Sequence, residues 1–88
     1  MNYFTTPTFK KKYKKKEHIS QSSIDEAIKL LVKNPHHPGL HTHKVRGTGN
    51  KAIFEAYVDD SARLTFEYNE SNIILRTNCT HKSVLDNP

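Results

Sequence analysis

Residues 52–79 read AIFEAYVDDSARLTFEYNESNIILRTNC, and apolar and polar side chains alternate along three parts of this run. Alternation with a period of two is typical of strands that bury one face of a sheet. The pattern predicts strands over residues 52–58, 63–68 and 73–79. The turns between them, at 59–61 and 69–72, are rich in Asp, Asn and Ser, which favours hairpins between consecutive strands.

The apolar residues also predict how these strands pair, because a slip of one residue would turn every core side chain outward. Phe54 facing Phe66 aligns the first hairpin, and Phe66 facing Leu75 aligns the second. Four polar pairs then lie on the other face: Tyr57 opposite Arg63, Glu55 opposite Thr65, Arg76 opposite Thr65, and Asn78 opposite Arg63.

The first half of the chain is predicted to be mainly helical. After a short strand over residues 2–5, Thr6-Pro7 caps a helix over about residues 7–17. A capping-box pattern over residues 23–26 opens a second helix, which buries an apolar stripe and ends at Asn34-Pro35. A loop over 35–43 and a short strand over 44–46 follow. We therefore expect one α+β domain over residues 1–88, in the order β-α-α-β-β-β-β, with two N-terminal helices packed on one face of a mostly antiparallel sheet.

The chain is basic, with 14 Lys and Arg residues against nine Asp and Glu residues and a net charge of +5. Such an excess points to a polyanion, an acidic protein or an anionic membrane surface as the partner. No signal-peptide pattern follows Met1, and no apolar run approaches the roughly 20 residues of a transmembrane helix. The single cysteine, Cys79, cannot form an internal disulfide. These features predict a cytoplasmic protein with no membrane partner.

The polar face of the predicted sheet carries the groups that RNA cleavage by 2′-hydroxyl attack requires. His81 follows the last strand and His43 precedes the short one, so both lie near the cleft that holds Arg63 and Tyr57. Histidine transfers protons near neutral pH, and arginine offers a cationic fork to phosphate oxygens. Such a reaction needs no metal or other cofactor, and the 2′-hydroxyl makes it specific for RNA. The candidate RNA contacts are Arg76, Asn78, Lys44, Arg46, Lys10, Lys11 and Lys14.

Simpler interpretations apply to the same residues. A strand arginine that faces outward is usually only solvated, and the lysine run over residues 10–16 is by default a solvated helix face. The histidines between residues 36 and 43 fit no standard zinc spacing and have no partner cysteine, which disfavours a metal site. Cys79 is assigned to the apolar face of its strand, as a core residue rather than a nucleophile. Glu55 and Glu67 are separated on adjacent strands, which disfavours a glycosidase-type pair.

Short motifs in a fixed order resemble the RelE/ParE toxin superfamily over nearly the whole chain. The motifs are Phe9-Lys10 to Tyr13-Lys14, Ala27-Ile28 to Leu30-Leu31, Asn34-Pro35 to Pro38-Gly39-Leu40, His43 to Gly47, Ala62 to Phe66, and Thr80-His81 with Val84-Leu85. The resemblance implies a RelE-like fold and a toxin of a bacterial toxin–antitoxin module, held inactive by a flexible, often acidic antitoxin. Most RelE-like members cut mRNA, usually on the ribosome, whereas ParE-like members inhibit DNA gyrase.

The resemblance also implies roles for four residues. Arg63 matches the arginine that contacts the scissile phosphate, and His81 matches a proposed proton-transfer histidine of YafQ- and YoeB-like nucleases. His43 matches a second such histidine, and Tyr57 occupies a position where some nucleases carry a polar catalytic group. The chain departs from the family in two places: Leu85 is the nearest residue to an aromatic that often follows the histidine, and Ser61 replaces a common acidic residue.

The resulting hypothesis is an endoribonuclease with Arg63 and Arg76 on phosphate, His81 as general acid, and His43 or Tyr57 as general base. The expected partners are a cognate antitoxin, mRNA and the ribosome. Two alternatives stay open: a non-enzymatic, ParE-like gyrase inhibitor, and a plain RNA-binding protein.

Overall fold

The computed structural model describes residues 2–45 and 52–79, so the candidate residues Arg46 and His81 lie outside the described residues. The predicted order of elements is confirmed, with a short 3-10 helix, η1, added after the second helix. The elements are β1 (Tyr3–Thr5), α1 (Pro7–Lys14), α2 (His18–Lys33), η1 (Pro38–Leu40), β2 (His43–Lys44), β3 (Phe54–Asp59), β4 (Ala62–Asn69) and β5 (Asn72–Cys79).

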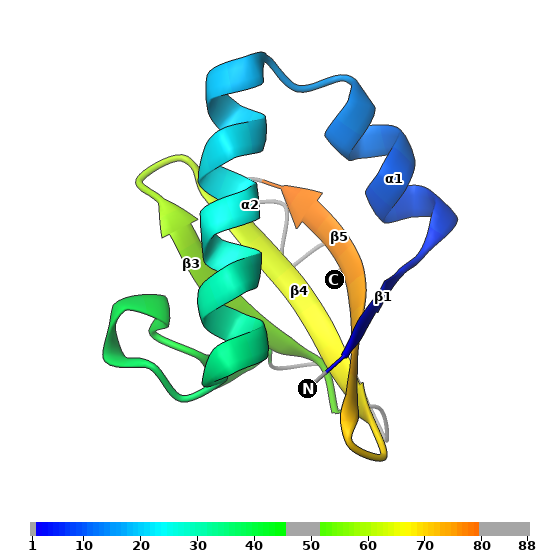
Figure 1. Ribbon diagram of the computed structural model, residues 1–88, viewed down its shortest axis with the longest axis vertical. Coiled ribbons are helices and arrows are strands. Elements are labelled where there is room, and N and C mark those ends of the chain that lie inside the picture. Colours follow the sequence, from blue (N-terminus) through cyan, green and yellow to red (C-terminus); the bar gives the residue numbers. More distant parts are fainter. Residues whose placement is uncertain (1, 46–51, 80–88) are drawn as a thin grey trace.

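The strands form one mixed sheet with the order β1-β5-β4-β3-β2. β1 pairs with β5 in parallel, and the other neighbours are antiparallel. Helix α2 crosses one face of this sheet, and α1 lies beside β5 (Figure 1). The expected α+β arrangement, with two helices on one face of a mostly antiparallel sheet, is confirmed.

The main core lies between the helices and the sheet. Phe9 of α1 and the α2 stripe meet Leu64 and Phe66, which are fully buried on β4. Phe54 stacks on Phe66 with 5.7 Å between the ring centroids. Burial of a large apolar side chain contributes about 1.5–3 kcal/mol each, so these contacts hold the helices against one face of the sheet.

The boundary between the helices differs from the prediction. α1 ends at Lys14, and α2 begins at His18, well before the expected capping box at Ser23. Ser23 lies inside α2, where its hydroxyl donates to the Ile19 carbonyl. Gln21, in the first turns of α2, donates its side-chain amide to the Tyr13 carbonyl at 2.9 Å. The Tyr13 carbonyl also accepts from the backbone N–H of Lys16 at 3.1 Å, so the Gln21 side chain adds a second bond there and ties the first turns of α2 to the end of α1.

The first hairpin has the predicted register, with Phe54 opposite Phe66, Glu55 opposite Thr65 and Tyr57 opposite Arg63. The second keeps the predicted pair of Phe66 with Leu75 and then departs from it. Thr65 pairs with Thr77, and Arg63 pairs with Cys79.

Arg76 is therefore an extra residue in β5, a β-bulge. The predictions that Arg76 lies opposite Thr65 and Asn78 opposite Arg63 are wrong. An extra residue reverses the alternation of the strand beyond it. Asn78 consequently faces the helices, where its side-chain amide donates to the Phe9 carbonyl at 3.1 Å.

Cys79 faces away from the helices, contrary to the predicted face. It packs with Val45 and Ile53 in a second, smaller apolar cluster. Cys79 is nonetheless buried. The prediction that it is a core residue is therefore confirmed, although it belongs to the smaller cluster and not to the main core. Because of the bulge, the last two residues of β5 face opposite sides of the sheet: Asn78 bonds to α1, and Cys79 packs beside Arg63.

We expect Asn78→Asp to lower the free energy of unfolding by about 2–4 kcal/mol, because a buried carboxylate replaces an amide donor that meets a carbonyl. Asn69→Asp makes the same chemical change at an exposed position of β4 and should change stability by no more than about 0.5 kcal/mol. Urea denaturation measures both. In the unbulged register, an Asp at position 78 would face Arg63, so a gain in stability would contradict the bulge.

Candidate active site

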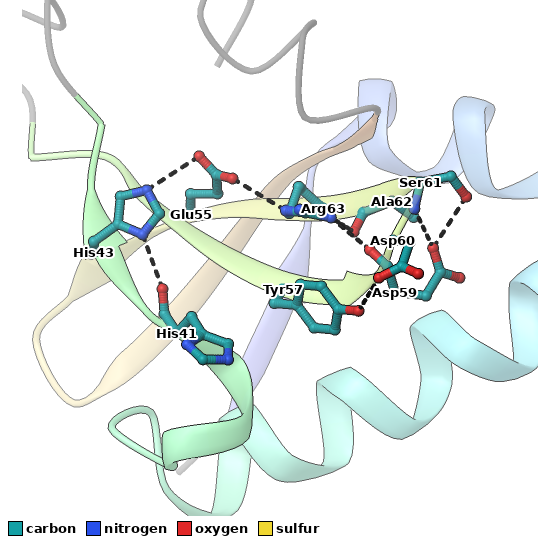
Figure 2. Close-up of polar contacts among 9 residues, drawn as sticks. All are labelled: His41, His43, Glu55, Tyr57, Asp59, Asp60, Ser61, Ala62 and Arg63. Carbon is teal, nitrogen blue, oxygen red and sulfur yellow. Dashed lines mark hydrogen bonds and ion pairs between the residues drawn. The ribbon is translucent and has the colours of Figure 1, made fainter.

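A buried carboxylate, Glu55 of β3, joins an arginine and a histidine side chain on the face of the sheet that points away from α2, here called the distal face (Figure 2). Glu55 is only 4% exposed. Its Oε1 lies 3.3 Å from Nε of Arg63 on β4, and its Oε2 lies 3.3 Å from Nε2 of His43 on β2. A buried carboxylate requires such partners, because an unpaired charge in the protein interior is strongly unfavourable.

Arg63 is held on several sides. Its Nε faces Glu55, and its Nη1 donates to the carbonyls of Asp59 and Ala62. The guanidinium carbon also lies 4.7 Å from the centre of the Tyr57 ring, within the range of a cation–π contact. The Arg63 side chain is 16% exposed. The sequence predicts a side chain that faces outward, and the structure holds it in a fixed orientation beside a carboxylate.

His43 projects from the edge strand β2, and its side chain is 58% exposed. Its Nδ1 lies 2.8 Å from the His41 carbonyl oxygen, which can only accept, so Nδ1 carries a proton in this hydrogen bond. Nε2 faces the Glu55 carboxylate. A ring protonated on both nitrogens donates to both oxygens. The ring of His43 is thus held between a carbonyl oxygen and a carboxylate oxygen.

Tyr57 lies beside Arg63 and His41. Its hydroxyl donates to Asp60 at 2.8 Å. This hydrogen bond raises the pKa of Tyr57, and burial and the negative charge of Asp60 add to the effect. The phenol therefore stays protonated near neutral pH. The Tyr57 ring meets His41 edge-on, with 5.8 Å between the centroids, so Tyr57 supports its neighbours as a platform, and His43 is the better candidate for a general base.

Other candidate residues lie away from this group. Arg76 pairs with Glu67 at 3.1 Å, about 13 Å along β4 from Arg63 at the usual rise of a strand. Asn78 is buried on the helix side. Lys10 and Lys14 line a hollow with Tyr3 and Asp25, between β1 and the helices. Lys11 and Lys44 are exposed, and their predicted contacts with RNA stay predictions.

Cys79 lies on the distal face beside Arg63. Burial raises the pKa of its thiol, and the positive charges of Lys12 and Lys16 oppose that effect only in part. The thiol is therefore protonated near neutral pH and poorly suited to act as a nucleophile.

Glu55 is the residue that the sequence interpretation missed as part of the site. The predicted register places it on the face of Tyr57 and Arg63, in the strand next to Arg63. A carboxylate so close to an arginine was the available signal.

Among residues 2–45 and 52–79, no three histidine, cysteine or acidic side chains come together in a way that could hold a metal ion. In the same ranges, neither helix has the length and apolar character needed to cross a membrane.

By sequence, no protein-family model and no curated protein matches the chain. By structure, the chain is similar to the DinJ–YafQ complex of Escherichia coli, with a TM-score of 0.75 and 16% identity over 94% of this chain and 96% of that chain. It is also similar to the RelE–RelB complex of Pyrococcus horikoshii, with a TM-score of 0.72 and 16% identity over 90% and 92% of the two chains. The antitoxin–toxin complex RelB–RelE of Methanococcus jannaschii matches with a TM-score of 0.66 and 24% identity over 94% and 95%. These comparisons confirm the predicted RelE-like fold.

The pairing of Glu55 with Arg63 can be measured by a double-mutant cycle. Arg63→Ala leaves a buried carboxylate without its main partner, and Glu55→Gln removes the charge that Arg63 faces. The double variant should therefore be more stable than the sum of the single changes predicts, by about 1–3 kcal/mol in urea denaturation.

The Glu67–Arg76 pair provides a matched control, because both of its side chains are about a quarter exposed. Its coupling should be below about 1 kcal/mol. Equal coupling in the two pairs would contradict a special role for the buried carboxylate.

Proposed function

We propose that this protein is the toxin of a toxin–antitoxin module and acts as a metal-independent endoribonuclease on mRNA in the cytoplasm. The observation that carries the proposal is one buried carboxylate, Glu55, between an arginine and an exposed histidine. The fold supports it, since similar structures include the RelB–RelE antitoxin–toxin complex. The charge of +5 also suits a polyanionic substrate.

In the proposed reaction, Nε2 of His43 takes the proton of the 2′-hydroxyl group. The freed oxygen attacks the adjacent phosphorus atom, and the bond from phosphorus to the 5′-oxygen breaks. His81 donates a proton to that leaving oxygen. The products are a 2′,3′-cyclic phosphate and a 5′-hydroxyl end, and the two histidines together return to their starting proton count. Either proton transfer by a positioned histidine contributes typically about 10²–10⁴-fold to the rate.

Glu55 assists the first of these steps. When His43 accepts the proton, the ring becomes a cation that can donate to both the His41 carbonyl and Glu55. Acceptors that are already in place stabilise this charge without reorganisation. Glu55 also orients Arg63, whose guanidinium then meets the negative charge on the phosphate.

The proposed partners are mRNA, with the ribosome as the site of cleavage, and a cognate antitoxin. An acidic, partly disordered antitoxin that folds on binding suits a basic protein, because opposite charge draws the two together and binding orders the flexible chain.

A non-enzymatic inhibitor of DNA gyrase is the alternative from another class. Such a protein acts through contact and needs no group that transfers a proton. The orientation of the His43 ring between a carbonyl and a carboxylate favours the nuclease.

Expression of this chain alone should stop bacterial growth, because an unneutralised ribonuclease of this kind removes translatable mRNA. Co-expression of the adjacent reading frame should restore growth. Colony counts after induction measure the effect. Normal growth with a good yield of folded protein would contradict the toxin proposal.

Catalysis can be separated from binding with His81→Ala and Arg63→Lys. Each should reduce cleavage by about 10²-fold or more, the first by loss of the acid and the second by loss of the guanidinium fork. Arg63→Lys keeps a cation beside Glu55, so its stability should stay close to that of the wild type. Arg76→Lys, at an arginine paired with Glu67, is the matched control.

Primer extension on a cellular mRNA after brief induction detects new 5′ ends. Discrete ends should appear with the wild type and Arg76→Lys, while antitoxin binding survives in all variants. Equal toxicity of wild type and His81→Ala, without new ends in either, would favour the gyrase inhibitor.

A further inference from the structure

The lysine run over residues 10–16 covers most of α1 and the two residues after it, and its side chains face different parts of the molecule. Phe9 and Tyr13 form the face of α1 that packs on the core. Lys10 and Lys14 lie on one side of it, beside Tyr3 and Asp25. Lys12 and Lys16 are half-buried, whereas Lys11 and Lys15 are exposed. Six lysines that look equivalent in the sequence are therefore in distinct environments.

The flank of Lys12 and Lys16 adjoins the end of β5. The Asn78 side chain donates to the Phe9 carbonyl at 3.1 Å and so fixes α1 to this end of the strand. Lys12 lies three residues further along α1, about 4.5 Å of helix rise. The charges of Lys12 and Lys16 act on the buried Cys79 thiol, where burial raises the pKa and the two lysines lower it. The bond between Asn78 and Phe9 thus places this part of α1 at the end of β5, where Cys79 follows Asn78.

Cys79 links this flank to the candidate active site. Tyr57 pairs with Arg63 across β3 and β4, and Arg63 pairs with Cys79 across β4 and β5. Neighbouring strands lie about 4.8 Å apart. The end of β5 that holds α1 is therefore one strand away from Arg63, and Lys12 adds a positive charge about one helical turn beyond that attachment.

We propose that Lys12 and Lys16 form a phosphate-binding flank that holds the backbone of single-stranded RNA beyond the cleavage site. The inference rests on the proposed nuclease function and names the path of its substrate. Arg63 is partly neutralised by Glu55, so a polynucleotide needs further cations to gain affinity. Lys12 on α1 and Lys16, two residues beyond the end of that helix at Lys14, supply them, and they replace Lys10, Lys11 and Lys14 as the main contacts of this lysine run.

The test compares two double variants that remove the same charge: Lys12→Gln with Lys16→Gln, and Lys11→Gln with Lys15→Gln. The probe is a fluorescent 2′-O-methyl RNA, which cannot be cut because its 2′-oxygen is blocked. A dinucleotide, which has a single phosphate between its two sugars, is compared with an oligonucleotide of about 12 nucleotides, which lies within the usual range of single-strand sites. Anisotropy titrations at several salt concentrations give the affinity and its salt slope.

With the longer RNA, loss of Lys12 and Lys16 should reduce the salt slope by about 1.4, since each phosphate contact on a single strand contributes about 0.7. Loss of Lys11 and Lys15 should leave the slope close to that of the wild type. With the shorter RNA, the two variants should bind alike, because the ligand does not reach α1. Lys12→Arg with Lys16→Arg should restore the slope, which separates charge from an effect on folding.

Equal losses in the two double variants would overturn the inference, because net charge alone would then explain the binding. An equal effect of Lys12 and Lys16 on both lengths of RNA would also overturn it. In either case, continued mRNA cleavage by the wild type would leave the proposed function intact. If the wild type neither binds these oligonucleotides nor cuts mRNA, the proposed function fails together with the flank.

Discussion

One extra residue in β5 sets the arrangement on which the rest of the structure depends. Between Leu75 and Thr77, the bulged Arg76 reverses the alternation of the strand. Asn78 then faces the helices and binds the Phe9 carbonyl, while Cys79 faces the distal face and packs with Val45 and Ile53. Without the reversal, an amide would lie beside Arg63 and a thiol beside α1, and α1 would lose its polar anchor to the sheet. The attachment of α1 to the end of β5 follows from the same residue.

Burial of a carboxylate imposes the second constraint. Glu55 has Arg63 on one side and His43 on the other, and its removal from water is tolerable only because those partners are present. The pairing is mutual, since the carboxylate also restricts the rotamers of Arg63 and the ring of His43. A group that orients two others in this way is a positioning residue in the proposed reaction, and it explains why an exposed edge strand as short as β2 can carry a histidine in a defined orientation.

The sequence predicts the alignment of the hairpins but not the bulge, the start of α2 or the role of Glu55, and each outcome has a physical reason. Phe54, Phe66 and Leu75 align the hairpins correctly because each is strongly apolar and has one acceptable face. Beyond Leu75 the residues are Arg, Thr, Asn and Cys, none of which demands the core, so the pattern contains nothing that locates a bulge. Near the start of α2, the Gln21 side chain bonds to the end of α1, a contact between helices that local capping signals do not describe. The pair of Tyr57 with Arg63 follows from register, and His43 is expected nearby because it precedes the short strand, whereas the role of Glu55 requires knowledge of its burial.

In the proposed nuclease, the charges of the distal face suggest that different residues contribute to RNA affinity and to the cleavage rate. Glu55 offsets the charge of Arg63. This pairing weakens the long-range attraction between the site and a polyanion. That attraction comes chiefly from charge that is not locally compensated, because release of counterions depends on the number of phosphates neutralised. In the proposed arrangement, Lys12 and Lys16 supply such charge near the end of β5, the strand next to Arg63. Arg63 then acts mainly as an oriented hydrogen-bond donor to the phosphate. The orientation of its guanidinium therefore affects the cleavage rate more than the affinity for RNA. The lysine flank has the opposite character, since a flexible ammonium binds phosphate without fixing its orientation.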